Sequence, residues 1–311
     1  MKKLFTILAV AAAVVACQKN ETIALDNGEA IAFGNAFVNN ATRADYSSTD
    51  ITAFKVYGTV NNVNIFNGDN VTKTAAYGEP WTLIDAETNQ PITQYWIDGA
   101  AYKFAAVVDA DKVNVDANGL PTSLEYSAAG QKDMLYNYVE ATGQPTGEND
   151  TVAFTFTHLL AKAYFTVTNN IADTKYTYTI SNVQVTNAYQ NGVYTIGVEE
   201  DGKINYAKGS WAGSNAKETA FAPIVSVANG SPKTNAEMLL IPTASVGVSF
   251  TVTLYINGEE VTSYPVTKTA VVTLAANSVY NFNVVFEALD QIQFTVTAKP
   301  NWGDTTTVPA N

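Results

Sequence analysis

Short runs of alternating hydrophobic and polar residues recur from residue 51 onward, and glycine, proline, asparagine and aspartate separate them. Alternation with a period of two predicts half-buried β-strands. The expected strands cover residues 53–60, 81–84, 94–97, 101–108, 134–139, 152–167, 176–185, 192–198, 238–241, 250–256, 261–266, 271–274, 279–286 and 292–298. Asn257 and Gly258 form the strongest hairpin signal among the turns. Beyond the first sixteen residues the sequence indicates no amphipathic helix of ten residues or more.

This pattern predicts an all-β protein. A chain of 311 residues is long for a single domain, and many short strands pack best as pairs of sheets. We therefore expect two β-sandwiches in tandem. The loop 141–150 is rich in glycine, proline and polar residues, so we place the domain boundary there, with an N-terminal sandwich at 44–150 and a C-terminal sandwich at 151–311.

Residues 1–16 are typical of a signal peptide. Lys2 and Lys3 precede an apolar run at 4–16 that is too short to span a bilayer. The run ends in Val-Val-Ala-Cys, which resembles the lipobox of bacterial lipoproteins, and Cys17 is the residue that would take the lipid. The alternative is a plain secretory signal followed by a chance cysteine. Acyl chains on Cys17 would anchor the protein in the outer membrane, and residues 18–21 resemble tags that send lipoproteins to the cell surface.

The lipidated segment 17–43 contains one alternating stretch, 31–37, which reads as a strand with Ile31 and Phe33 on the same face. A polar break follows at 39–45 and contains Arg43, the only arginine of the chain. An isolated arginine in a flexible polar linker is a site for a trypsin-like protease. We therefore expect cleavage between Arg43 and Ala44.

Charge and composition exclude several classes of function. The net charge of −12 and the pI near 4.5 repel phosphate backbones, so nucleic acid is not an expected partner. One cysteine and one histidine allow neither an internal disulfide nor a zinc site with the usual four ligands. The sequence contains neither a G-x-G motif nor a P-loop, so nucleotide chemistry is unsupported. We expect no metal and no cofactor.

The candidates for catalysis and sugar binding each have a simpler structural interpretation. His158 lies within an expected strand, where a histidine held by the sheet is more common than a catalytic one. The acidic residues cluster in turns, which favours solvated loop charge over a glycosidase pair. The loop 109–119 lacks the glycine and the closing glutamate of a calcium loop. The aromatic residues that could form a sugar platform, but more often form a sandwich core, are Trp81, Trp96, Tyr102 and Tyr136.

Taken in order, the landmarks of the chain resemble those of the fimbrillin family, the lipoprotein precursors of type V pili. The matching segments are the lipobox at Cys17, Ile31 with Phe33, 42–44, 51–57, 95–96, 102–104, 132–136, 156–158, 161–162, 165–167, 279–282, 292–296 and Trp302. The resemblance implies two transthyretin-like or immunoglobulin-like β-sandwich domains and a surface lipoprotein without enzymatic activity. It also implies that an arginine-directed protease removes the leader, and that a C-terminal strand of another subunit fills the vacated groove.

On this resemblance, Ile292, Phe294 and Val296 are the candidate donor-strand residues that would replace Ile31 and Phe33. The linker before them is short, however, so the strand 292–298 could instead pair within its own domain, which would suit a tip or accessory subunit. The expected partners are other fimbrial subunits, the outer membrane through the lipid anchor, and a ligand on a host or microbial surface. The alternative functions are a surface glycan-binding lipoprotein and, last, a secreted hydrolase.

Overall fold

The computed structural model of the chain describes residues 29–38, 51–73, 81–144, 151–200, 203–220, 224–230, 232–235, 237–270, 272–300, 302 and 308–309. Nearly all of these residues lie in or between β-strands, and the one helical element among them is the 3-10 turn η1 (Ala128–Gly130). The prediction of an all-β protein is therefore confirmed. Within the described ranges, no helix is long and apolar enough to cross a membrane.

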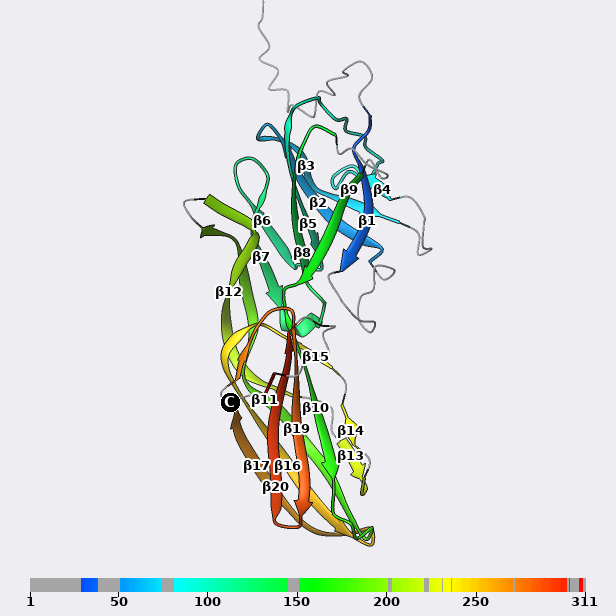
Figure 1. Cartoon of the computed structure of the whole chain (residues 1–311), viewed down its shortest axis with the longest axis vertical. Coiled ribbons are helices and arrows are strands. Elements are labelled where there is room, and N and C mark those ends of the chain that lie inside the picture. The colour runs from blue at the N-terminus through cyan, green and yellow to red at the C-terminus, as the bar shows by residue number, and fades with distance from the viewer. Residues whose placement is uncertain are drawn as a thin grey trace, which may run out of the picture.

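A seven-stranded sheet forms one end of the elongated molecule, the upper end in Figure 1. Its strand order is β1-β9-β8-β5-β2-β3-β4. The strands are β1 (Ala32–Val38), β2 (Ala53–Val60), β3 (Val63–Thr72), β4 (Thr82–Ile84), β5 (Ala101–Val108), β8 (Leu135–Thr142) and β9 (Thr151–His158). We call it sheet 1.

Two further sheets pack together at the opposite end of the molecule, and one of them, sheet 3, extends to the upper end as well. Sheet 2 has the order β14-β10-β19-β20-β21, with β15 also paired to β10. Its strands are β10 (Ala161–Asn169), β14 (Lys233–Thr234), β15 (Met238–Leu240), β19 (Ser278–Ala288), β20 (Gln291–Pro300) and β21 (Val308–Pro309).

Sheet 3 has the order β17-β16-β11-β7-β6; β12 and β13 also pair with β11, and β18 pairs with β16. Its strands are β6 (Lys112–Val115), β7 (Pro121–Ser127), β11 (Tyr176–Glu200), β12 (Lys203–Ala220), β13 (Ile224–Val227), β16 (Thr243–Ile256), β17 (Glu259–Ala270) and β18 (Val272–Leu274).

The long strand β11 connects the two ends of the molecule. Its first part, through Thr186, pairs with β16 of the lower end, and its residues 191–195 pair with β7 of the upper end. Its last residues continue as a hairpin arm with β12, which projects at the left of Figure 1. Sheet 3 therefore packs against both of the other sheets.

Alternation along the strands distributes their side chains between separate cores. In β8, Leu135 and Val139 pack in a cluster on one face of sheet 1, and Tyr136 and Tyr138 pack in a second cluster on its other face. Such a division follows from the two-residue period of a strand. A third cluster fills the space between sheets 2 and 3.

The change from sheet 1 to sheet 2 occurs at Leu159 and Leu160. The run 152–167, predicted as one strand, is two strands, because β9 pairs with β1 and β8 whereas β10 pairs with β19. The predicted boundary at residue 150 would separate β9 from the sheet to which it is paired. The division into two domains stays a prediction.

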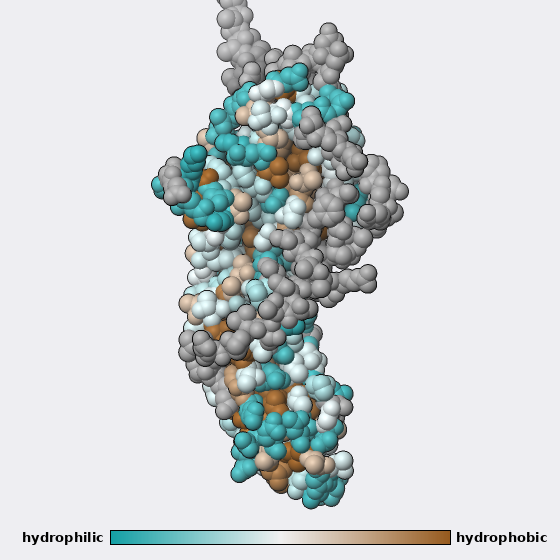
Figure 2. Space-filling view, viewed as in Figure 1, coloured by the Kyte–Doolittle hydropathy of each residue, from teal (hydrophilic) through white to brown (hydrophobic). Residues whose placement is uncertain are grey.

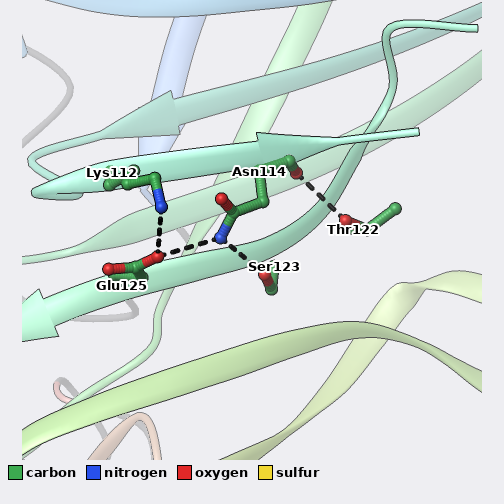
Figure 3. Close-up of polar contacts among 5 residues, drawn as sticks. All are labelled: Lys112, Asn114, Thr122, Ser123 and Glu125. Atoms are coloured by element: carbon green, nitrogen blue, oxygen red, sulfur yellow. Dashed lines mark hydrogen bonds and ion pairs between the residues drawn. The ribbon is translucent and has the colours of Figure 1, made fainter. Parts of the chain in front are cut away.

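The edge strand β6 is short and carries polar side chains (Figure 3). Lys112 lies 2.8 Å from the Glu125 carboxylate on β7, and the Asn114 amide donates to Ser123 and to Glu125. A short, charged edge discourages pairing with another chain. We therefore interpret this polar ladder as protection of the sheet edge.

The surface seen in Figure 2 is mixed in character. Hydrophobic residues form separate patches among hydrophilic ones on this face of the molecule. Scattered patches are normal for a protein surface and mark no docking site by themselves.

Candidate assembly site

Strand β1, in the segment predicted to be a leader, is an edge strand of sheet 1, and residues 29–31 just before it pair with the segment 94–96. On one side it pairs in parallel with β9, from Ala32 opposite Thr151 to Val38 opposite Phe156. On the other side the Ile31 amide donates to the carbonyl of Gln94 at 2.7 Å, and the amide of Trp96 donates to the carbonyl of Glu29 at 2.9 Å. The leader therefore contributes backbone hydrogen bonds to both of its neighbours.

Ile31 and Phe33 fill the core of sheet 1. Their exposed fractions are 5% and 6%. The Phe33 ring stacks on Phe154 at 5.9 Å and meets Phe66 edge to face at 5.6 Å. Phe54 and Phe104 each lie 6.2 Å from it. We call these five rings the phenylalanine cluster, and Phe33 is the member that all the others contact.

Gly34 permits the close approach of β1 to β9. A Cβ atom at this position would lie 2.1 Å from the Thr151 hydroxyl oxygen and 3.0 Å from its Cβ. The register also shifts between Phe33 and Ala36, as in a β-bulge. A side chain at Gly34 would thus force β1 away from its partner.

The segment that pairs with the leader is fixed by Tyr102 of β5. The Tyr102 hydroxyl accepts a hydrogen bond from the Ile97 amide at 2.6 Å, and the Trp96 ring packs against the Tyr102 ring at 4.7 Å. Burial raises the pKa of Tyr102, while the hydrogen bond from Ile97 lowers it. A protonated Tyr102 can also donate to the carbonyl of Tyr95, at 3.4 Å.

The predicted site residues fall into three groups. Ile31 and Phe33 lie together on one face, in the core of sheet 1. Cys17, Arg43 and Ala44 lie outside the residues that the structure describes. Ile292, Phe294 and Val296 belong to a different sheet and are not brought near the leader within this molecule.

The candidate donor strand β20 is paired within its own chain. Residues of β20 from Gln291 to Pro300 face β19 in antiparallel register, and β21 pairs with its other edge. Val296 is buried at 5% exposure, and Ile292 and Phe294 pack partly buried against the same core. Pairing of this strand within its own chain is the alternative that the short linker before residue 292 suggested.

The aromatic residues considered for a sugar platform belong mainly to the core. Trp96, Tyr102 and Tyr136 are 4%, 1% and 3% exposed. Trp81 is partly buried against Phe54, with ring centroids 5.1 Å apart. The first three rings present no open face to a sugar.

His158 is fully buried at the end of β9. Its Nδ1 lies 3.0 Å and 2.8 Å from the two carboxylate oxygens of Asp133, and its ring stacks on Trp302. Histidine held in this way by a carboxylate and an aromatic ring fits the structural role. Within the described ranges, no group of three or more histidine, cysteine or acidic side chains is placed to hold a metal ion.

The sequence did not reveal the partners of the leader strand. The hydrogen bonds to Gln94 and Trp96 join segments far apart in the chain, and 94–97 was predicted only as a strand of its own. The aromatic character of Trp96, which is buried in the core of sheet 1, was the one signal that this segment is held in place there.

A family model described as fimbrillin-like matches residues 42–302, most of the chain. The protein belongs to the fimbrillin-like family. This membership makes it a structural protein of cell-surface fimbriae and not an enzyme. The matched residues begin just before Arg43 and end at Trp302, so they include all three sheets except β1 and β21.

Solved structures share the fold of this fimbrillin-like chain. One, from Bacteroides ovatus, is a candidate cell adhesion protein with 15% identity and a TM-score of 0.53, covering 90% of this chain and 100% of its own. Another candidate cell adhesion protein, from Bacteroides uniformis, has 17% identity and a TM-score of 0.51, covering 80% and 91%. No curated protein matches the chain.

Proposed function

We propose that this protein is a structural or adhesive subunit of surface fimbriae that is exported as a lipoprotein and assembled by strand exchange. In this account Cys17 carries the lipid that holds the precursor in the outer membrane. A protease then cuts between Arg43 and Ala44, and the released leader leaves β9 and the segment 94–96. A strand from another subunit takes its place.

The observation that carries the proposal is the burial of the leader strand. After a cut at Arg43, the leader would be held only by its hydrogen bonds and by the packing of Ile31 and Phe33. Its departure would expose the phenylalanine cluster and leave one edge of β9 unpaired. Both features favour an incoming strand, because main-chain hydrogen bonds supply affinity and alternate side chains fill pockets.

The pairing of β20 bears on the position of the subunit in the fibre. To act as a donor, β20 would have to leave β19 and remove Val296 from its core. We therefore infer that the subunit accepts a strand while keeping its own β20, as a tip or accessory subunit would. The adhesive role is supported by the fold shared with the candidate adhesion proteins from Bacteroides.

Substitution of Arg43 by alanine tests the proposal. The variant should stay uncut, with lipidated Cys17 as its N-terminus in mass spectrometry, and it should be missing from sheared fimbriae. The neighbouring change Ala44→Ser is the matched control and should be cut and incorporated normally. Normal fimbriae carrying the Arg43→Ala protein, or a wild-type subunit in fimbriae that still retains residues 17–43, would refute strand exchange at this site.

A further inference from the structure

The hairpin arm formed by β11 and β12 contains a large bulge. Ile196 faces Gly209 and Val198 faces Asn205, so Gly197 alone opposes the three residues 206–208. Gly197 has a φ of +89°, and a Cβ atom there would lie 2.7 Å from the Ile204 side chain. Bulges of this kind bend a strand and redirect side chains, and they are frequent beside functional sites.

The bulge carries Tyr206 onto the face of β8 that holds Tyr136 and Tyr138. The rings of Tyr206 and Tyr138 lie 5.1 Å apart at an angle of 31°. The Tyr136 hydroxyl donates to the carbonyl of Tyr206 at 3.1 Å, and the Tyr138 hydroxyl donates to Glu140 at 2.7 Å. The two rings are thus held in place before any ligand arrives, which lowers the entropic cost of binding.

A cavity of about 620 Å³ opens between the arm and β8, lined by these two tyrosines together with polar side chains. This volume lies within the range of roughly 300–1,000 Å³ that is usual for small-molecule sites. Figure 2 shows the projecting arm as mainly hydrophilic with a hydrophobic patch beside it. Ile204 on the arm is 57% exposed.

The polar groups of this cavity are arranged as an ordered network. Glu200 accepts hydrogen bonds from Lys208 at 2.6 Å and from the Asn205 amide at 3.0 Å. The hydrogen bond from Lys208 holds the pKa of Glu200 below its usual value, so this carboxylate is ionised at neutral pH. The Asn205 side chain accepts from the amide of Ala207 and closes the bulge.

Charges of both signs surround the cavity, which favours a neutral ligand. Glu140 and Glu200 line the cavity with Lys203, while Lys208 pairs with Glu200 and Lys103 lies 5.8 Å from the Tyr206 ring centroid. A strongly charged ligand would meet repulsion from one of these sets. A neutral polyol can instead donate hydroxyl groups to carboxylates, accept from amide and ammonium groups, and lay an apolar C–H face on a tyrosine ring.

We propose that the cavity lined by Tyr138 and Tyr206 binds a neutral glycan. The site would give the subunit an adhesive contact independent of assembly. Tyr138 lies on the face of β8 opposite to Val139, which packs with the phenylalanine cluster. Ligand binding and strand exchange therefore use opposite faces of sheet 1.

Affinity electrophoresis of the full chain tests this proposal, with dextran, mannan and galactan as neutral probes and polygalacturonate as the acidic probe. At least one neutral polysaccharide should retard the protein. Tyr206→Ala should abolish the retardation, and Glu200→Gln should weaken binding by about ten-fold or more, because a charged hydrogen-bond acceptor is lost. Glu260→Gln changes another exposed glutamate beside a hairpin and should bind as the wild type does.

Three results would overturn the proposal: no retardation by any neutral probe, retardation by polygalacturonate alone, or unchanged binding by both Tyr206→Ala and Glu200→Gln. Because Tyr206→Ala could loosen the arm, its thermal unfolding is compared with that of the wild type, and Glu200→Gln supplies the second variant. Incorporation into fimbriae should be normal for Glu200→Gln. A failure of glycan binding is thereby separated from a failure of strand exchange.

Discussion

The imidazole ring of His158 stacks face to face on the indole of Trp302, with 3.7 Å between centroids and 14° between planes. His158 ends β9 in sheet 1, and Trp302 follows β20 of sheet 2. Lys162 of β10 lies 4.4 Å from the Trp302 ring centroid. The indole therefore joins the ends of the two sheets at the point where the chain passes between them.

Loss of this indole should destabilise the whole chain. Trp302 is 7% exposed, and removal of a large buried aromatic side chain costs about 3–5 kcal/mol. We expect Trp302→Ala to lower the midpoint of urea unfolding, measured by circular dichroism, and Trp302→Phe to lower it less because a ring still covers His158. Equal midpoints for Trp302→Ala and the wild type would show that the stack contributes nothing.

The sequence predicted two strands of sheet 1 at the bounds that the structure shows. The ranges 53–60 and 101–108 coincide with β2 and β5. The prediction of one continuous strand over 152–167 was wrong. Leu159 and Leu160 are both buried, so the apolar pattern continues through the point at which the backbone passes from sheet 1 to sheet 2. Periodicity reports burial, so it cannot separate a buried turn from a buried strand.

Strand β3 was missed because its composition is typical of a turn. It contains Asn67-Gly68-Asp69, and Gly68 has a φ of +80°. The structure accommodates these residues because the Asp69 carboxylate accepts hydrogen bonds from the amides of Asn67 and Ala86. The contact with Ala86 is long-range and leaves no local signal in the sequence.

The sequence predicted the leader residues of the candidate assembly site, but not the segments with which they pair. The shared face of Ile31 and Phe33 followed from their spacing, and the structure places both in the core of sheet 1. The leader pairs with β9 and with the segment 94–96, and the tyrosine pair of the proposed glycan site joins β8 to β12. Such pairings depend on tertiary topology, which alternation does not encode.

Truncation of Phe33 should destabilise the uncut precursor. The ring contacts four other phenylalanines, and its loss leaves a cavity that costs about 3–5 kcal/mol. Urea unfolding followed by tryptophan fluorescence should show a lower midpoint for Phe33→Ala. The neighbouring exposed change Ala32→Ser is the control and should stay within about 0.5 kcal/mol of the wild type. If the leader contributed nothing to the core, the unfolding midpoints of Phe33→Ala and Ala32→Ser would both equal that of the wild type.

A side chain at Gly34 should displace the leader strand. Gly34→Ala places a methyl group against the Thr151 hydroxyl, and threonine is too stiff at χ1 to turn away freely. Hydrogen exchange of the β1 amides should therefore rise in this variant. The double variant Gly34→Ala with Thr151→Gly removes the obstructing side chain and should restore part of the protection. Equal exchange in the single and double variants would show that the contact with Thr151 is not the cause of the displacement.

The stability of the protein should fall at alkaline pH because buried tyrosines resist ionisation. Burial raises the pKa of Tyr194 to about 12, and the same effect, with the charge of Asp69 adding to it, raises the pKa of Tyr57 to about 12. Between the unfolded pKa near 10 and the folded value, the unfolded chain loses protons that the folded chain keeps, so the free energy of unfolding decreases as pH rises. Below pH 10 both states are protonated and this contribution is constant. Tyr194→Phe removes one such group, and its free energy of unfolding, measured in urea from pH 8 to pH 12, should decline less steeply than that of the wild type. Parallel curves for the two proteins across this range would show that the Tyr194 hydroxyl is not desolvated by folding.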